Sequence, residues 1–387
     1  MSEVFILAGA RTPIGAFQGA LSTMTAPQLG SIAIVAALER AGVAPDQVDE
    51  VLMGNVLSAG IGQAPARQAS LGAGIPQSVP CTTVNKVCGS GMKAVMMAAQ
   101  AIKCGDAATV VAGGMESMSN APYILPQART GYRMGNGTLV DEMIHDGLWD
   151  PYNNMHMGNC GDLCAKEFNY SREEIDAYAA ESFHRATTAQ KEGRLAEEIV
   201  SVKVPQRKGD PIEVKDDEQP SRGDVSKLAG LRPAFGAEGV TTAGNASSIN
   251  DGAAALVLSS SNNGKALAKV IAYSQHAHDP KFFTTAPAEA IKKLLTKAGL
   301  KVQDIDVFEV NEAFAVVAMH SQREVGLPME KLNVNGGAVS LGHPIGATGA
   351  RLVLTAAMEL KRRGGRYAIA TPCIGGGEAT AVLIERA

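Results

Sequence analysis

This chain of 387 residues has few aromatic residues, and its cysteines form no CxxC pair. Aromatic side chains make up 4% of it, whereas glycine occurs 42 times, a composition typical of a tightly packed α/β protein with many short turns. The cysteines are scattered along the chain: Cys81, Cys88, Cys104, Cys160, Cys164 and Cys373. This distribution favours neither a disulfide framework nor a CxxC metal site, so we expect no bound metal.

Charge and hydropathy narrow the classes of protein further. The formal net charge of -4 gives no support for nucleic-acid binding. No apolar run reaches the roughly 18 residues of a membrane span, so we expect no membrane partner. Residues 1–7 have no basic region and begin as a strand rather than as a signal peptide. The simplest expectation is a reduced, cytoplasmic protein.

Strand and helix signals alternate along the chain. Residues 4–8 and 108–114 are short apolar runs that predict buried strands. Residues 26–41 have helical spacing and end at Gly42, and residues 65–71 predict a helix with proline in its first turn. Such alternation indicates an α/β fold with a mainly parallel sheet covered by helices.

The sequence also repeats itself. Three stretches of the first half return in the same order: residues 38–49 as 295–306, residues 83–85 as 333–335, and residues 110–114 as 368–372. Ordered self-similarity on this scale favours a duplicated domain over chance likeness between α/β segments.

The segment between the two halves has a different composition. Residues 172–194 predict a charged amphipathic helix, and residues 203–224 carry mixed charges typical of a solvated face or mobile loop. Residues 253–258 predict a strand that returns to the first half. We therefore predict an N-terminal half of 1–116 plus 244–264, an inserted loop domain of 117–243 that binds the ligand, and a C-terminal half of 265–387.

Cys88 stands where an apolar run gives way to a helical pattern. Gly89 and Gly91 permit a sharp turn and a close approach of a ligand to the backbone. We expect Cys88 to face the free N–H groups of the helix start, which favour the thiolate and lower the thiol pKa. A buried structural cysteine is the alternative, but the residues that follow favour a nucleophile.

Candidate partners for Cys88 occur in the second half, where strands are predicted to end. Asn311 follows an apolar strand, His343 lies between two glycines, and Cys373 precedes three glycines. Ligands of parallel α/β sheets bind beyond the carboxyl ends of the strands, so one shared pocket is expected. There Cys88 forms a thioester, His343 acts as base, and Cys373 carries a proton. Asn311 positions a water, and the N–H groups of Gly375 to Gly377 stabilise an oxyanion.

Residues 84–93, 311–314, 342–346 and 373–377 resemble the motifs of the thiolase family, in the same order, and the likeness covers essentially the whole chain. The resemblance implies a duplicated, five-layered αβαβα fold with an inserted loop domain, usually in dimers or tetramers. It implies a coenzyme A thioester as substrate and no other cofactor.

Within the family, residues 147–150 and 154–158 are similar to the loop of the biosynthetic type. That type condenses two acetyl-CoA to acetoacetyl-CoA and CoA. Phe282 and Phe283 depart from its pattern, which often has Met there. The resemblance also implies residues that bind the substrate: Leu148, His156, Met157, Arg222, Phe235, Ala243, Ser247, Ala313 and Phe314.

Three other functions remain open from the sequence. The first is a degradative thiolase that cleaves longer 3-ketoacyl-CoA chains in β-oxidation. The second is a non-catalytic binder of acyl-CoA or lipid on the same scaffold, which the presence of all four motifs disfavours. The third is a cysteine hydrolase, which does not require the second thiol of Cys373.

Overall fold

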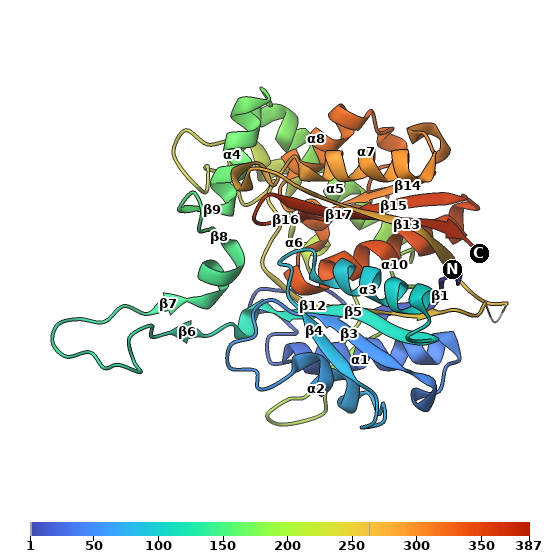
Figure 1. Ribbon diagram of the computed structural model, residues 1–387. Coiled ribbons are helices and arrows are strands. Elements are labelled where there is room, and N and C mark those ends of the chain that lie inside the picture. The colour runs from blue at the N-terminus through green and yellow to red at the C-terminus, as the bar shows by residue number, and fades with distance from the viewer. Residues whose placement is uncertain (1, 263) are drawn as a thin grey trace.

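The computed structural model describes residues 2–262 and 264–387. Residues 1 and 263 belong to the predicted N-terminal half and lie outside the described part. Helices and sheets alternate in five layers, with outer helices, a sheet, two central helices, a second sheet and a further set of outer helices (Figure 1). The layering is that of the predicted αβαβα fold.

The strands of the two sheet layers form one hydrogen-bonded path, joined by a short pairing of β1 with β13 (Ala268–Ala277) at Phe5 and Ile6. The first of the two layers, called the first sheet, has the strand order β4-β3-β5-β12-β1. Its strands are β1 (Phe5–Arg11), β3 (Glu50–Gly54), β4 (Cys81–Val84), β5 (Thr109–Ser117) and β12 (Asn250–Ser259), with the short β2 (Gly15–Ala16) beside β12. Strand β3 is parallel to β4 and β5, whereas β12 is antiparallel to β5 and β1. The predicted return of the chain at residues 253–258 is therefore β12, inserted between β1 and β5. The prediction of a mainly parallel sheet is wrong, because antiparallel pairs outnumber parallel ones among the described strands of the large sheet.

The second sheet repeats this arrangement. Its strands are β13 (Ala268–Ala277), β14 (Val307–Val310), β15 (Tyr367–Thr371) and β17 (Glu378–Arg386), with β16 (Cys373–Ile374) beside β17. The order is β14-β15-β17-β13, and a parallel bridge from Phe308 to Leu332 takes the place of the fifth strand. Parallel and antiparallel pairs follow the same sequence as in the first sheet, which is the geometry that a duplicated domain requires.

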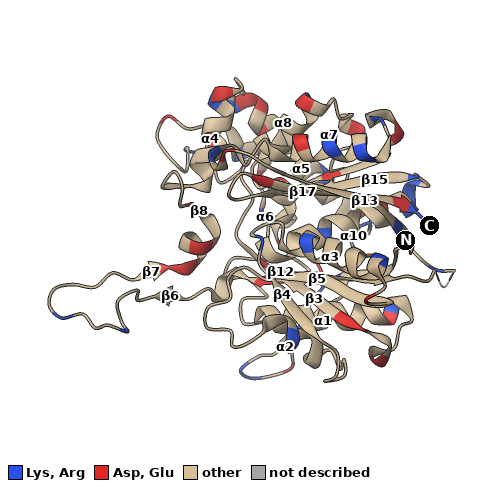
Figure 2. Ribbon diagram, viewed as in Figure 1, with Lys and Arg blue, Asp and Glu red and all other residues tan. Residues whose placement is uncertain are grey.

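Helices cover both sheets. The central layer is α3 (Ser90–Cys104) and α10 (Ile345–Arg363), and the outer helices are α1 (Ala26–Ala41) and α2 (Pro65–Gly72) on one side and α7 (Ala286–Ala298) and α8 (Ala315–Val325) on the other. Helix α1 spans the predicted residues because Thr25 and Gln28 form a capping box and Gly42 ends the helix with φ 64°. Strand ribbons in Figure 2 are mostly uncharged, whereas α1 and α7 carry charges on their outer sides.

The central helices pack closely because glycine lies at their crossing. A Cβ atom on Gly91 would lie 2.9 Å from the backbone nitrogen of Ala350, and one on Gly349 would meet the backbone of Met92. One continuous apolar core joins both helices to the inner faces of both sheets. The starts of α3 and α10 are thereby held side by side.

Between β5 and β12 the chain leaves the sheet. This excursion contains β6 (Tyr123–Ile124), β7 (Val140–Asp141), the π-helical turn η3 (Met143–Leu148), β8 (Trp149–Asp150), β9 (Met155–His156), α4 (Met157–Glu167), α5 (Arg172–Lys191), β10 (Val202–Val204), β11 (Ile212–Val214), α6 (Gln219–Arg222) and the 3-10 helices η2 (Met118–Asn120) and η4 (Val225–Gly230). Elsewhere lie α9 (Ala338–Leu341) and the 3-10 helices η1 (Pro45–Gln47), η5 (Pro280–Phe282), η6 (Val302–Asp304) and η7 (Met329–Lys331). The division at residues 116, 243 and 264 stays a prediction.

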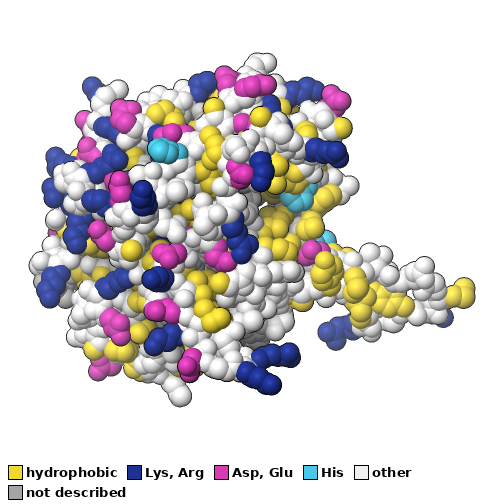
Figure 3. Space-filling model, turned by 180° about the vertical axis from the view of Figure 1, so that it is seen from behind, with side chains coloured by type: hydrophobic (Ala, Val, Ile, Leu, Met, Phe, Trp, Pro, Cys, Tyr) yellow, Lys and Arg dark blue, Asp and Glu magenta, His cyan; other side chains and the backbone are white. Residues whose placement is uncertain are grey.

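An arm that carries β6 and β7 extends away from the layered body (Figure 1). Large apolar side chains are exposed along it, among them Tyr123, Leu125, Met134 and Leu139. Figure 3 shows apolar side chains gathered on the arm and where it meets the body. Within the described residues, no helix combines the length and the hydropathy needed to cross a bilayer.

Candidate active site

Cys88 lies in the tight turn between β4 and α3. The turn places Val87 in the left-handed region with φ 45°, and Gly89 caps the helix that follows. Cys88 is buried, and the N–H groups of Gly375 and of Cys88 itself donate hydrogen bonds to its sulfur. The helix starts at the predicted place, and the sulfur faces two backbone donors.

The expected lowering of the Cys88 pKa is wrong for the free protein. Burial raises the pKa of the thiol to about 11, although both N–H donors act in the opposite direction. The free energy needed to remove a thiolate from water is larger than the stabilisation that two backbone N–H dipoles provide. Cys88 therefore rests as a neutral thiol.

Cys373 lies on β16, fully buried behind Cys88. Burial raises the pKa of its thiol, and the neighbouring Cys88 raises it further, because two neighbouring thiolates repel each other. The backbone N–H of Ala313 and the side chain of Asn311 donate to the Cys373 sulfur and lower the pKa. The fold thus brings together two thiols that are 285 positions apart in the sequence.

His343 is buried beside this pair with a defined tautomer. Its Nδ1 lies 2.7 Å from Oγ1 of Thr348, whose own hydroxyl donates to the carbonyl of Pro344 at 3.0 Å. That hydroxyl oxygen therefore accepts from His343, which assigns the ring proton to Nδ1. The lone pair on Nε2 is left to accept from Nδ2 of Asn311 at 3.3 Å.

The His343 ring is neutral in the free protein. Burial lowers its pKa to about 3, and the charge of Arg351 adds to this effect. Asn311 joins His343 to Cys373 and keeps a buried Oδ1 atom without a partner among the described residues. This oxygen is an acceptor available to a water or to the substrate.

A cavity of about 240 Å³ opens onto Cys88 and His343, whereas Cys373 and Asn311 are buried beside it and do not line it. It is lined by Cys88, Met118, Gly147, Leu148, His156, Met157, Phe235, Ala246, Ser247, Ser248, Ile249, Phe283, Ala313, Phe314, His343 and Ile345. Rings form one wall, since His156 stacks on Phe235 at 4.6 Å and Phe314 meets both Phe235 and Phe283 edge to face at 6.3 Å. The site combines two thiols, a neutral imidazole and an amide under a largely apolar cavity.

Comparison with known proteins identifies the family of this chain. The family model described as "Thiolase, N-terminal domain" matches residues 4–262, and "Thiolase, C-terminal domain" matches residues 264–386. The chain belongs to the thiolase family.

Relatives in plants, bacteria and fungi resemble this thiolase along its full length. It is 55% identical to "Acetyl-CoA acetyltransferase 2" of Arabidopsis thaliana over 99% of this chain and 97% of the relative. It is 50% identical to "Acetyl-CoA acetyltransferase" of Cupriavidus necator, over all of both chains. It is 48% identical to the protein of the same name in Schizosaccharomyces pombe, over all of this chain and 99% of the relative.

Most of the residues predicted to bind substrate line the cavity of this thiolase. They are Leu148, His156, Met157, Phe235, Ser247, Ala313 and Phe314. Gly375 lines an adjoining hollow of about 640 Å³ together with Val87 and Tyr152. Ala243 and Arg222 lie at the exposed surface, and Arg222 pairs with Glu218 at 2.9 Å. Neither residue contributes to the 240 Å³ cavity, so their contact with a nucleotide stays a prediction.

Sequence reasoning missed several residues of the lining, among them Met118 and Ile249. These are plain apolar residues that the thiolase fold brings in from two separate segments, and nothing in their local sequence distinguishes them from the core. The sequence did give one indication for Phe283, which lines the cavity, because phenylalanine departs there from the pattern of the biosynthetic type. Cys160 and Cys164 are buried in an apolar core cluster. Across the described chain, no cluster of His, Cys, Asp and Glu is suited to hold a metal ion.

Two buried carboxylates anchor the loops of the thiolase site. Glu116 accepts four N–H bonds, from Asn55 and Leu57 on one oxygen and from Val56 and Gly346 on the other, at 2.8 to 3.1 Å. Burial raises the pKa of Glu116 to about 8, against these donors. We favour the ionised form, because four donors and no acceptor face it.

Glu312 is the second anchor. It accepts from the hydroxyls of Tyr178 and Ser182, from the side chain of Asn333 and from the backbone of Val339, at 2.7 to 3.2 Å. Being next in the chain, it fixes the backbone from which Asn311 projects.

Proposed function

We propose that this thiolase is an acetyl-CoA C-acetyltransferase, which condenses two acetyl-CoA to acetoacetyl-CoA and CoA and catalyses the reverse thiolysis. The observation that carries the proposal is the placement of Cys88, Cys373 and His343 together, with the N–H groups of Cys88 and Gly375 at the Cys88 sulfur. The names of the full-length relatives support the same activity.

In the first half-reaction, the Cys88 sulfur attacks the carbonyl carbon of acetyl-CoA while its proton passes to Nε2 of His343. Thiol and imidazole are both neutral at rest, so proton transfer accompanies the attack rather than preceding it. The N–H groups of Cys88 and Gly375 hold the oxyanion, and each such donor contributes about 10²–10³ in rate. The C–S bond to CoA breaks, and the CoA sulfur takes the proton of Cys373.

In the second half-reaction, the Cys373 thiolate removes a proton from the methyl group of a second acetyl-CoA. The enolate oxygen is held by the Nε2–H of His343 and by a water on Oδ1 of Asn311. The carbanion attacks acetyl-Cys88, and the departing Cys88 sulfur regains its proton from His343. Both thiols and the imidazole end as they began, so the cycle consumes only the two molecules of acetyl-CoA.

Incubation with acetyl-CoA labelled in the acetyl group tests the proposal. We expect label on Cys88 in the wild type and none on that position in Cys88→Ser. No label on the wild type, or undiminished label on the variant, would leave only a binding role on the thiolase scaffold.

The cavity supports a short acyl chain over the longer chains of a degradative thiolase. Its volume of about 240 Å³ lies below the range of about 300–1,000 Å³ usual for pockets that take drug-sized ligands, and rings close one wall. We expect thiolysis of acetoacetyl-CoA to exceed that of a medium-chain 3-ketoacyl-CoA. The opposite order of kcat/KM would assign the protein to fatty-acid breakdown.

We further propose a homo-oligomer, a dimer or tetramer, in a reducing compartment such as the cytoplasm. The exposed apolar side chains of the arm support self-association, because a two-stranded hairpin is only marginally stable in water. All six cysteines are free, as in most cytosolic proteins. Sedimentation of the full chain and of a variant with the arm shortened tests the first point, and a monomeric wild type would contradict it.

A further inference from the structure

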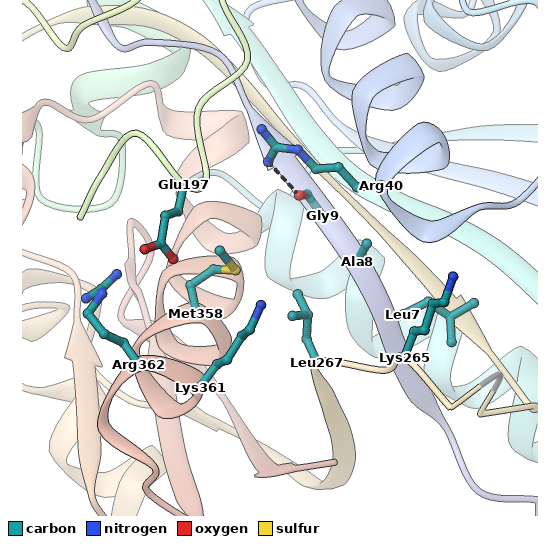
Figure 4. Close-up of a pocket in the computed structure, with 10 residues that line it drawn as sticks. All are labelled: Leu7, Ala8, Gly9, Arg40, Glu197, Lys265, Leu267, Met358, Lys361 and Arg362. Atoms are coloured by element: carbon teal, nitrogen blue, oxygen red, sulfur yellow. Dashed lines mark hydrogen bonds between the residues drawn. The ribbon is translucent and has the colours of Figure 1, made fainter. Parts of the chain in front are cut away.

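A second cavity, of about 620 Å³, lies at the other end of α10 from His343. It is lined by Leu7, Ala8, Gly9, Arg40, Glu197, Lys265, Leu267, Met358, Lys361 and Arg362 (Figure 4). Helix α10 spans 19 residues, which corresponds to roughly 28 Å along its axis, so this cavity is remote from the thiols. It opens where β1 and β13 stop pairing, since only Phe5 and Ile6 of β1 have partners on β13.

Positive charge dominates the lining, with four cationic side chains against one acidic side chain, Glu197. Arg40 is fixed as part of the wall, because it donates to the carbonyls of Gly9, Glu198 and Ile199 at 2.8 to 3.0 Å. Its carbonyl partners carry no net charge, and the carboxylate of Glu198 acts on the guanidinium only through the field, so Arg40 adds positive charge to this wall.

The other cations differ in their partners. Arg362 pairs with Glu359 and donates to the carbonyl of Arg194 at 3.2 Å, and its Nε is buried without a partner among the described residues. Lys361 and Lys265 are exposed, and neither makes a hydrogen bond or an ion pair within the described chain. In Figure 4 the ammonium group of Lys361 lies between Arg362 on one side and Lys265 on the other.

Apolar side chains supply the rest of the wall. Leu7 and Leu267 come from β1 and from the chain just before β13, and Met358 comes from α10. A phosphate ion alone would leave this apolar surface uncovered, whereas a ligand with a ring would cover it. The volume is within the range of pockets that hold a nucleotide-sized molecule.

We propose that this cavity binds a phosphate-bearing ligand of nucleotide size, with its phosphates on Lys361 and Lys265 and its ring on Leu7, Leu267 and Met358. The walls come from the strands and helices of both sheets, so a bound ligand links the two duplicated halves and stabilises the fold. ADP, ATP and free CoA share this chemistry, and the proposal is independent of the reaction assigned to Cys88.

Binding of ADP by calorimetry tests the proposal, and substitutions of Lys361 and Lys265, which do not line the 240 Å³ cavity, distinguish the two sites. We expect ADP to bind, to raise the melting temperature and to bind about tenfold or more weakly to Lys361→Glu and Lys265→Glu. The affinities of ATP and CoA, measured in the same way, show which of the three ligands binds most tightly. Inorganic pyrophosphate should bind more weakly than ADP because it lacks a ring.

Lys166→Glu is the matched control, because Lys166 is also an exposed lysine in the last turn of a helix, here α4. It should bind ADP within twofold of the wild type. The proposal is overturned if ADP does not bind at 1 mM, which corresponds to about -4 kcal/mol, or if Lys361→Glu and Lys166→Glu bind it equally.

Discussion

The tautomer of His343 depends on one hydroxyl, so Thr348→Val isolates its contribution. Valine has nearly the shape of threonine but removes the oxygen that lies 2.7 Å from Nδ1 of His343. The carbonyl of Pro344 keeps its bond from the Thr348 backbone N–H at 3.0 Å, so the helix start is retained. The perturbation is confined to the imidazole.

The cost follows from the buried N–H that loses its acceptor, about 1–3 kcal/mol. The ring avoids this cost by moving its proton to Nε2, where it faces the amide nitrogen of Asn311. A bias of 1–3 kcal/mol against the tautomer with a free Nε2 lowers its population about 5- to 150-fold. We expect kcat for thiolysis of acetoacetyl-CoA to fall by that factor.

KM should change by less than about threefold, since Thr348 does not line the cavity. Thr348→Ser keeps the hydroxyl and is the matched control, with kcat expected within threefold of the wild type. Steady-state kinetics and urea unfolding of all three proteins are the measurements. An unchanged kcat in Thr348→Val, or equal losses in the valine and serine variants, would refute the assigned tautomer.

Three further outcomes follow from the buried groups of the site. Cys373→Ser should lose at least 10²-fold in condensation, about the contribution of a general base, while Cys88 still takes the acetyl label; condensation within tenfold of the wild type would contradict the second-thiol role. Glu116→Gln should cost about 3 kcal/mol or more in urea unfolding at pH 7, because one oxygen that accepts two N–H bonds becomes a donor. A cost below about 1 kcal/mol would mean that Glu116 is protonated, as burial alone predicts. His343 has a folded pKa of about 3, below its unfolded value near 6.5, so its stabilising effect is complete above pH 6.5 and declines as the pH falls toward 3. Between pH 6.5 and 5 the wild type should lose about 2 kcal/mol more than His343→Asn, and equal losses would contradict a neutral buried ring.

Much of the fold could be predicted from local sequence. Helix α1 begins and ends at the predicted residues because its caps, Thr25 and Gly42, are local features. The repeated stretches predicted the duplication, which the matching strand orders of the two sheets reproduce. The candidate residues could be named for a similar reason, because Cys88, His343 and Cys373 lie in glycine-rich turns that stand out from the surrounding apolar runs.

Tertiary structure decided what local sequence cannot encode. The pKa of Cys88 was predicted to be lowered by the helix start, but burial by segments far away in the chain raises it. The apolar lining from Met118 and Ile249 also had no local signal, because an apolar side chain has the same sequence signature in a core and in a cavity. The sequence by itself determined the elements, their duplication and the reactive groups. Only the packing of α3 against α10 decided which groups meet and how far water is excluded from them, because distance and desolvation are set by residues remote in the chain.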